Sequence, residues 1–234
     1  MAQRTPKGKF ITVEGLDGCG KSTQLERLAN ALRAEGIDAV VTREPGGTPV
    51  GEKLRAVVLD SRTAGLSSLA ELAILFASRA QHIAEVILPG VQAGKWVLCD
   101  RFTDSSEAYQ GGGRELGSEA VLTLHRVLCG NLQPDLTILM DSDVAASVAR
   151  ARRRNTAVRD SSQIDENRFE QENKTFFTRV RDKYMEIAKR EPQRVVIVDA
   201  RRPADVVHPE ILNVVRNRLV ELTVDANGRV KSGD

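Results

Sequence analysis

One glycine-rich segment constrains the fold of this chain more than any other part of its sequence. The segment, Gly15-Leu16-Asp17-Gly18-Cys19-Gly20-Lys21-Ser22-Thr23, matches the phosphate-binding pattern G-x-x-x-x-G-K-S/T. An apolar run at 10–13 precedes it, and leucines at helical spacing follow it. Glycines let the backbone curl until several N–H groups point at one anion, and the N-terminus of the next helix adds its positive dipole end. The segment therefore predicts a strand, a phosphate-binding loop and a helix, in that order.

Within this loop, the lysine and the serine have the clearest chemistry. Lys21 can reach the β- and γ-phosphates of a nucleotide, and the Ser22 hydroxyl can contact Mg²⁺. A chance glycine-rich turn is the alternative, but it does not explain why the glycines, the Lys-Ser pair and the flanking strand and helix patterns occur together. We therefore expect the nucleotide to be bound by Gly15, Asp17, Gly18, Cys19, Gly20, Lys21, Ser22 and Thr23.

The rest of the chain repeats the alternation of strand and helix. Nearly continuous apolar runs, typical of strands covered on both faces, lie at 9–13, 39–42, 96–99, 136–140 and 194–198. Helical patterns lie at 22–35, 67–92, 118–128, 144–154, 168–190 and 203–222. Strands that alternate with helices form right-handed crossovers, so the sequence predicts an α/β fold with a five-stranded parallel sheet flanked by helices.

Length and composition suit one soluble domain. The 234 residues fit a single α/β domain, which we place at 1–224, followed by an irregular, flexible tail at 225–234. Lysine and arginine total 34 against 32 acidic residues, and the net charge of +2 argues against nucleic acid as the main partner. The N-terminus lacks the apolar core of a signal peptide, and no apolar run approaches the ~20 residues that span a bilayer. We therefore expect a cytoplasmic protein with no membrane partner.

Charged residues follow the predicted strands at one edge of the sheet. Arg43 follows the second strand, Asp100 and Arg101 follow the third, and Asp141 follows the fourth. In open parallel sheets, ligands bind beyond the carboxyl ends of the strands. A binding site therefore explains these charges better than a solvated surface does.

Further short motifs occur in a fixed order after the loop: Thr42-Arg43-Glu44-Pro45-Gly46-Gly47-Thr48, Lys53-Leu54-Arg55, Leu75-Phe76-Ala77-Ser78-Arg79-Ala80-Gln81, Asp100-Arg101-Phe102, Ser105-Ser106-Glu107-Ala108-Tyr109-Gln110-Gly111-Gly112-Gly113, Pro134-Asp135-Leu136 and Arg168-Phe169-Glu170-Gln171-Glu172. From Lys9 to about Leu222 the chain resembles bacterial thymidylate kinases, which transfer the γ-phosphoryl group of ATP to dTMP. The resemblance implies a three-layer P-loop NTPase fold with a helical lid at about 150–166. It also implies ATP and dTMP as substrates, Mg²⁺ as the metal, and a homodimer.

The resemblance implies roles in binding dTMP. Arg55 and Arg101 are similar to arginines that hold the acceptor phosphate, and Asp17 to a carboxylate that contacts the 3′-hydroxyl of the sugar. Phe76 is similar to a phenylalanine that stacks on thymine, although a core phenylalanine is the usual alternative. Arg79 lies on the same helix face, and its guanidinium only donates, which suits the O4 carbonyl of thymine and disfavours the amino group of cytosine. The implied dTMP site consists of Asp17, Arg55, Phe76, Arg79, Arg101, Ser105, Tyr109 and Gln110.

The lid is expected to supply a catalytic arginine. Some relatives carry this arginine in the phosphate-binding loop, at the position that Gly18 occupies here, so the basic run 150–159 is the alternative source. Such an arginine can contribute roughly 10³–10⁵ in rate. The lid candidates are Arg150, Arg152, Arg153, Arg154 and Arg159. The expected catalytic set is Lys21, Arg101, Arg153 and Asp17.

Three residues are expected to hold the metal: Ser22, Asp100 and Glu170. A carboxylate at the end of the third strand could bind Mg²⁺ directly or through water. Asp141 also follows an apolar strand and is the alternative ligand, but the resemblance favours Asp100 and leaves Asp141 with a structural role.

Other functions remain compatible with the sequence. Another nucleotide or nucleoside kinase of the same fold would share the loop, but a neutral acceptor hydroxyl would leave Arg55 and Arg101 unpaired. A nucleotide-dependent binding or switch module would keep the loop with little turnover. Nucleic-acid binding through the run 150–159 is a third alternative, and it would be sensitive to salt.

Overall fold

The computed structural model describes residues 8–63, 65–158, 168–169, 171–219, 223–224 and 230–231. Its main strands are β1 (Lys9–Glu14), β2 (Ala39–Arg43), β3 (Trp96–Asp100), β4 (Leu136–Asp141) and β5 (Val195–Asp199). They form one parallel sheet in the order β2-β3-β1-β4-β5, which confirms the expected fold class. Each strand differs by a single residue, at one end or both, from its predicted range, and Asp100 and Asp141 are the last residues of their strands.

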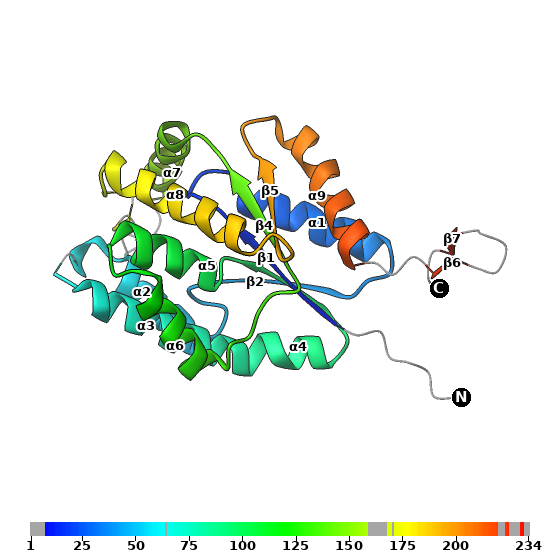
Figure 1. Cartoon of the computed structure of the whole chain (residues 1–234), viewed down its shortest axis with the longest axis horizontal. Helices are drawn as coiled ribbons and strands as arrows, with labels where there is room; N and C mark the ends of the chain where they lie inside the picture. Colours follow the sequence, from blue (N-terminus) through cyan, green and yellow to red (C-terminus); the bar gives the residue numbers. More distant parts are fainter. Residues whose placement is uncertain are drawn as a thin grey trace.

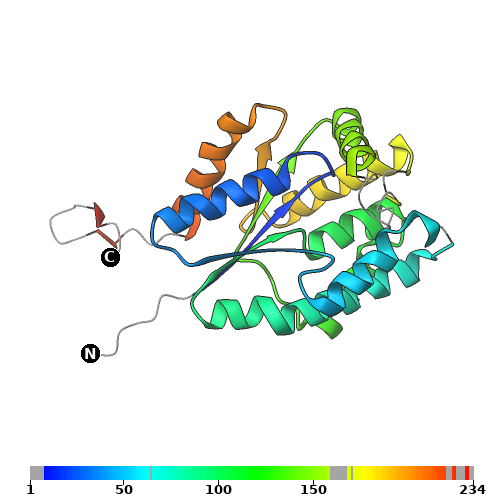
Figure 2. The ribbon, with the colours of Figure 1, turned by 180° about the vertical axis from the view of Figure 1, so that it is seen from behind.

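Helices cover both faces of this sheet (Figure 1 and Figure 2). One face packs against α1 (Lys21–Ala34) and α9 (Ala204–Leu219), and the other against α3 (Ser68–His82), α6 (Ser118–Cys129) and α8 (Lys174–Arg190). Ile11 and Val13 of β1 lie in the core with α1 and α9, whereas Phe10 lies in the core with α3 and α6. Successive side chains of a strand point to opposite faces, so a continuous apolar run supplies two separate cores.

The predicted helix at 67–92 forms one helical run, Ser68–Gln92, with a π-helical turn inside it. It consists of α3, a π-helical turn over Ile83–Ile87, and α4 (Leu88–Gln92). Pro89 lies in the first turn of α4, where its missing N–H is tolerated.

The predicted helix at 168–190 is too long at its N-terminus. Its helical part, α8, begins at Lys174, because the Asn173 side chain caps it by accepting a 2.9 Å hydrogen bond from the Phe176 N–H. Arg168 and Phe169 therefore lie in a turn before the helix.

Two helices near the site were not predicted, α2 (Pro49–Leu59) and α5 (Thr103–Ser106). A signal for α2 was present, because Thr48 caps it and a proline occupies its first turn. Helix α7 (Val144–Val158), which carries the first part of the predicted lid, extends beyond its predicted end at 154.

A π-helical segment over Glu107–Gly113 follows α5 and carries Tyr109 and Gln110. Its last glycine makes room for α8, because a Cβ atom on Gly113 would lie 2.5 Å from the Phe176 ring. The glycines of this motif therefore allow a close approach between the segment and α8, and π-helical turns are frequent at functional sites.

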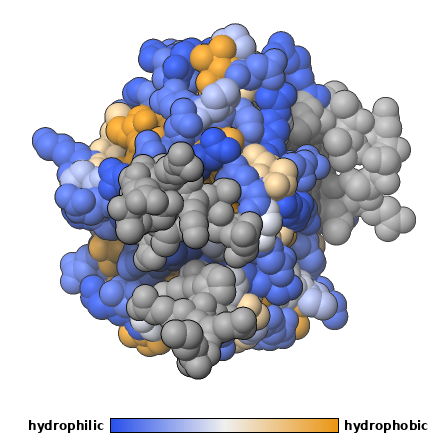
Figure 3. All heavy atoms as spheres, turned by 90° about the vertical axis from the view of Figure 1, so that its right-hand side faces the viewer, coloured by the Kyte–Doolittle hydropathy of each residue, from blue (hydrophilic) through white to orange (hydrophobic). Residues whose placement is uncertain are grey.

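Within the predicted tail at 225–234 the structure describes only β7 (Val230–Lys231), which pairs in an antiparallel hairpin with β6 (Thr223–Val224). Within the described part of the chain, one helical run, Ser68–Gln92, is long and apolar enough by composition to cross a membrane. This run contains buried Glu71 and Arg79, whose partners lie on other elements, as is typical of a core helix. The face in Figure 3 is mainly hydrophilic, with apolar residues in small separate groups.

Candidate active site

The phosphate-binding loop connects β1 to α1 at the carboxyl edge of the sheet. Gly20 is the N-cap of α1 and has no side-chain cap, so the first N–H groups of the helix are available to an anion. The Lys21 ammonium is almost buried and donates to the carbonyls of Gly15 and Leu16 at 3.2 and 2.9 Å. The Cys19 N–H donates within the loop, to the Leu16 carbonyl at 3.3 Å. This geometry is typical of a loop that binds nucleotide phosphates.

Helix α7, part of the predicted lid, packs directly on this loop at Gly18. The glycine has a φ of +78°, and a Cβ atom there would lie 2.3 Å from the Ser147 carbonyl oxygen. The Arg150 Nε atom donates to the Gly18 carbonyl at 2.7 Å. In this arrangement the loop has no space for a side chain at position 18, and the lid brings an arginine to the same point.

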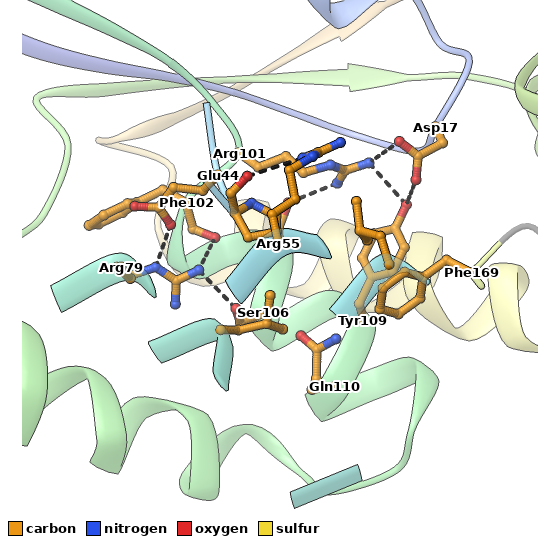
Figure 4. Close-up of a pocket in the computed structure, with 14 residues that line it drawn as sticks. Asp17, Glu44, Arg55, Arg79, Arg101, Phe102, Ser106, Tyr109, Gln110 and Phe169 are labelled. Atoms are coloured by element: carbon orange, nitrogen blue, oxygen red, sulfur yellow. Dashed lines mark hydrogen bonds and ion pairs between the residues drawn. The ribbon is translucent and has the colours of Figure 1, made fainter. Parts of the chain in front are cut away.

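A cavity opens beside the loop, between β3, α2, α3 and the π-helical segment (Figure 4). Seven of the eight expected acceptor-site residues line it: Asp17, Arg55, Arg79, Arg101, Ser105, Tyr109 and Gln110. Sequence reasoning gave no role to the other lining residues, Glu44, Pro45, Leu59, Leu75, Phe102, Ser106 and Phe169.

Arg101 joins the cavity to the loop. Its Nη2 atom donates to the Asp17 carboxylate at 2.8 Å and to the Tyr109 hydroxyl at 3.1 Å. Burial opposes ionisation of Asp17, but the charges of Arg101 and Lys21 outweigh it and hold the pKa of Asp17 well below its usual range. Arg101 also has a φ of +72°, a strained conformation for a side chain other than glycine. Such strain is frequent where a side chain is held for function.

A buried carboxylate, Glu14, is connected to Arg101 through two shared hydrogen-bond partners. Glu14 accepts hydrogen bonds from the Ser105 hydroxyl at 2.5 Å, the Tyr184 hydroxyl at 3.0 Å and the Phe102 N–H at 2.7 Å. Arg101 in turn donates to the Ser105 and Tyr184 hydroxyls at 2.8 and 3.2 Å. Burial raises the pKa of Glu14 to about 7, and the nearby Asp104 charge adds to the effect. Tyr184 lies on α8, far from the motifs, and the sequence gave no signal for it.

Arg79 is held by polar groups at the other end of the cavity. Its Nε atom donates to Glu44 at 2.6 Å, and its Nη2 atom donates to the Phe102 carbonyl at 3.1 Å and the Ser106 hydroxyl at 2.9 Å (Figure 4). The third nitrogen, Nη1, is buried and has no hydrogen-bond partner among the described residues. A donor is therefore left over in a residue that lines the cavity.

Phe76 lies away from the cavity that its expected role requires. Its ring is fully buried in the core with α6, does not line the cavity, and lies under the Arg79 guanidinium at 4.6 Å. Leu75 lines the cavity instead. The separation of four residues between Leu75 and Arg79 places both on one helix face, whereas Phe76 is rotated into the core.

Two of the three expected metal ligands lie together. The Ser22 hydroxyl donates to Asp100 Oδ2 at 2.9 Å, and Asp100 Oδ1 is buried without a hydrogen-bond partner among the described residues. Glu170 lies outside those residues, within which no cluster of three histidine, cysteine or acidic side chains could hold a metal. Asp141 accepts two hydrogen bonds from Arg181, at 2.7 and 2.9 Å, which is a structural ion pair.

The structure separates the lid arginines. Arg150 reaches the loop, Arg152 donates to the Glu172 carbonyl at 3.2 Å, and Arg153 is exposed. The Arg154 side chain and all of Arg159 lie outside the described residues. The geometry therefore favours Arg150 for contact with a bound phosphate, and the catalytic role of Arg153 stays a prediction.

Comparisons with known proteins identify one protein family over most of the chain. A family model described as thymidylate kinase matches residues 13–211. The thymidylate kinase of Desulfovibrio desulfuricans is 48% identical over 196 residues, which cover 84% of this chain and 89% of that protein. The thymidylate kinase of Bordetella pertussis is 46% identical over 217 residues, 93% of this chain and 99% of that protein. The crystal structure of thymidylate kinase from Ehrlichia chaffeensis has a TM-score of 0.70 and 32% identity, and the match covers 90% of this chain and 99% of that one.

Proposed function

The chain belongs to the thymidylate kinase family, and we propose that it transfers the γ-phosphoryl group of ATP to dTMP, giving ADP and dTDP. One observation carries the proposal. Arg101, a cavity residue suited to a phosphate, contacts Asp17 of the phosphate-binding loop, so donor and acceptor sites adjoin.

The acceptor phosphate would bind at the end of the cavity near the loop. Arg55 and Arg101 both line this cavity, and a planar guanidinium suits bidentate contact with a phosphate. An acceptor phosphate is already anionic at neutral pH, so transfer needs little proton abstraction. A nucleoside would bring only a neutral hydroxyl to these arginines, which disfavours a nucleoside kinase.

The base would bind at the other end, near Arg79. The Nη1 atom of Arg79 still has hydrogen-bonding capacity, and it can donate to the O4 carbonyl of thymine but not to the amino group of cytosine. Leu75 and Phe169 supply apolar contacts for the ring, while Tyr109 and Gln110 line the same cavity near the sugar and base. This arrangement supports selection of thymine over cytosine.

The triphosphate of ATP would bind in the loop. The free N–H groups at the start of α1 and the Lys21 ammonium would neutralise the phosphates, and Arg150 or Arg153 of the lid would add charge as the phosphoryl group moves. Closure of the lid would exclude water, which would otherwise hydrolyse ATP.

Mg²⁺ fits the site beside Ser22 and Asp100. A hydroxyl and one carboxylate, together with water and substrate phosphates, are a typical Mg²⁺ environment, and the unpaired Asp100 Oδ1 atom has capacity for such a contact. When bound, the ion would neutralise charge on the phosphates of ATP. Glu170 stays a proposed third ligand.

We also propose a homodimer in the cytoplasm. Apolar side chains on the outer surfaces of α3 and α6 support an interface there, because Leu69, Val127 and Leu128 are 62, 73 and 45% exposed. Size-exclusion chromatography with light scattering tests the dimer directly.

A coupled assay of ADP release tests the proposed function. We expect ADP to appear with Mg²⁺, ATP and dTMP, and much less with dCMP, AMP or thymidine. Lys21→Ala is the matched negative variant, with at least ~100-fold lower turnover and little change in the folded state. ADP release without dependence on dTMP would contradict the proposal, and a salt-sensitive shift of an oligonucleotide would favour nucleic-acid binding instead.

A further inference from the structure

A chain of hydrogen bonds connects β2 to Arg79. The Thr42 hydroxyl lies 2.6 Å from His82 Nε2, and His82 Nδ1 lies 3.0 Å from Glu44 Oε1. The other carboxylate oxygen of Glu44 accepts the 2.6 Å hydrogen bond from Arg79 Nε. Glu44, Arg79 and His82 are at most 4% exposed, so water competes little for these contacts.

The chemistry of these hydrogen bonds determines which group donates at each step. An ionised carboxylate only accepts, so His82 must donate to Glu44 through Nδ1. A neutral imidazole then has Nε2 free to accept from the Thr42 hydroxyl. Thr42, His82 and Glu44 thereby satisfy one another, which is the condition under which a buried polar network is rigid.

This chain of hydrogen bonds holds the Arg79 guanidinium at its Nε atom. Phe102 and Ser106 accept from Nη2, and the Phe76 and Phe102 rings lie 4.6 and 5.2 Å from the guanidinium carbon. With Nε and Nη2 engaged and two aromatic rings packed beside it, the guanidinium is held in one orientation. That orientation leaves Nη1 as the donor without a partner among the described residues.

We propose that Glu44 and His82 are positioning residues that orient Arg79 and thereby determine selectivity for the base. The inference rests on the proposed function, since it assigns Arg79 to the O4 carbonyl of the acceptor. Glu44 lines the cavity and His82 does not, and both act on the base through Arg79. A carboxylate on Nε fixes which guanidinium nitrogen is presented to the base.

Steady-state kinetics of two variants test the proposal. Glu44→Gln removes the carboxylate charge that contacts Arg79 Nε, and His82→Leu removes the hydrogen bond between His82 and Glu44. We expect both to raise the KM for dTMP about tenfold, while kcat and the KM for ATP change by less than about threefold. dUMP carries the same O4 carbonyl, so its KM should rise by the same factor. The preference for dTMP over dCMP should fall.

Two further variants separate positioning from stability. The amide nitrogen of His82→Asn can replace Nδ1 as the donor to Glu44, so this variant should restore the KM for dTMP to within about threefold of the parent protein. His125→Gln is the matched control, because His125 is a buried histidine that lies beside the Phe76 and Phe102 rings but bonds to Thr103 rather than to Arg79. It should lower the melting temperature and leave the KM values unchanged.

The outcomes are distinct. An unchanged KM for dTMP in Glu44→Gln and His82→Leu, with lower stability alone, would overturn the proposal and assign the network to folding. Should one of these two variants fail to fold, the other decides the test, and an unchanged KM for dTMP there would count against positioning. If the parent protein shows no dTMP-dependent ADP release, the proposed function fails instead.

Discussion

The Asp17 carboxylate and the Arg101 guanidinium are joined by a 2.8 Å hydrogen bond, which connects the phosphate-binding loop to the acceptor cavity. Tyr109 reinforces the pair, since it donates to Asp17 at 3.0 Å and its ring lies 4.9 Å from the guanidinium carbon. An acceptor phosphate would therefore meet an arginine whose position is already set by the loop that holds the donor.

Asp17→Asn should impair transfer to dTMP more than binding of ATP. Loss of a charge-assisted hydrogen bond costs about 1.5–3 kcal/mol, so kcat/KM for dTMP should fall roughly 10- to 100-fold. Asp205→Asn, which breaks an exposed pair with Arg27, is the control and should have no effect. Equal kinetics for both variants would show that the Asp17–Arg101 pair does not serve the acceptor.

Stability should depend on pH through Glu14. Burial raises the pKa of Glu14 from 4.5 to about 7, so the folded state binds a proton that the unfolded chain releases. The contribution of this proton to the free energy of unfolding is fully present below pH 4.5 and is lost as the pH rises through about 7. Glu14→Gln should therefore stabilise the protein at pH 8 relative to pH 5, by roughly 1–3 kcal/mol. Thermal melts at both pH values, with the exposed Glu26→Gln as control, measure the difference.

Neighbouring residues on α3 should respond differently to substitution. Leu75→Ala should raise the KM for dTMP, because Leu75 lines the cavity, and should also lower stability, because Leu75 is buried. Phe76→Leu should cost about 1–3 kcal/mol of stability, because its ring is fully buried. Melting curves and dTMP kinetics measured on both variants test the assignment. The opposite pattern would restore Phe76 as the base contact.

Removal of either proposed metal ligand should raise the Mg²⁺ requirement. We expect Asp100→Asn to need at least ~10-fold more Mg²⁺ for half-maximal activity, and Ser22→Ala to need less extra Mg²⁺. Asp141→Asn is the control, because Asp141 pairs with Arg181. A higher requirement in the control alone would transfer the metal role to Asp141.

The lid arginines should differ in their kinetic effect. Arg150→Ala should lower kcat at least ~100-fold with little change in the KM for dTMP, the pattern of an interaction made in the transition state. Arg153→Ala is measured beside it, since both residues are candidates. Gly18→Ala should lower kcat as well, because the added methyl would meet the Ser147 carbonyl and displace α7. If Arg150, Arg152, Arg153, Arg154 and Arg159 each tolerate alanine, the lid does not supply the catalytic charge.

The order of strands and helices, and the phosphate-binding loop, were predictable from local pattern. The run at 10–13, the glycines and the Lys-Ser pair lie within a short stretch of the chain, where spacing alone limits the conformation. Seven of the fourteen residues that line the cavity were predictable too, because they belong to short sequence motifs.

Side-chain direction and distant partners were decided only by the tertiary structure. Phe76 and Leu75 are adjacent apolar residues on α3, and the sequence cannot say which one faces the cavity until α6 covers the other side of the helix. Tyr184 reaches Glu14 across 170 positions of the chain, and no local pattern records that contact. Local spacing determines secondary structure and motifs, whereas the packing of elements distant in sequence determines which side chains share a buried site.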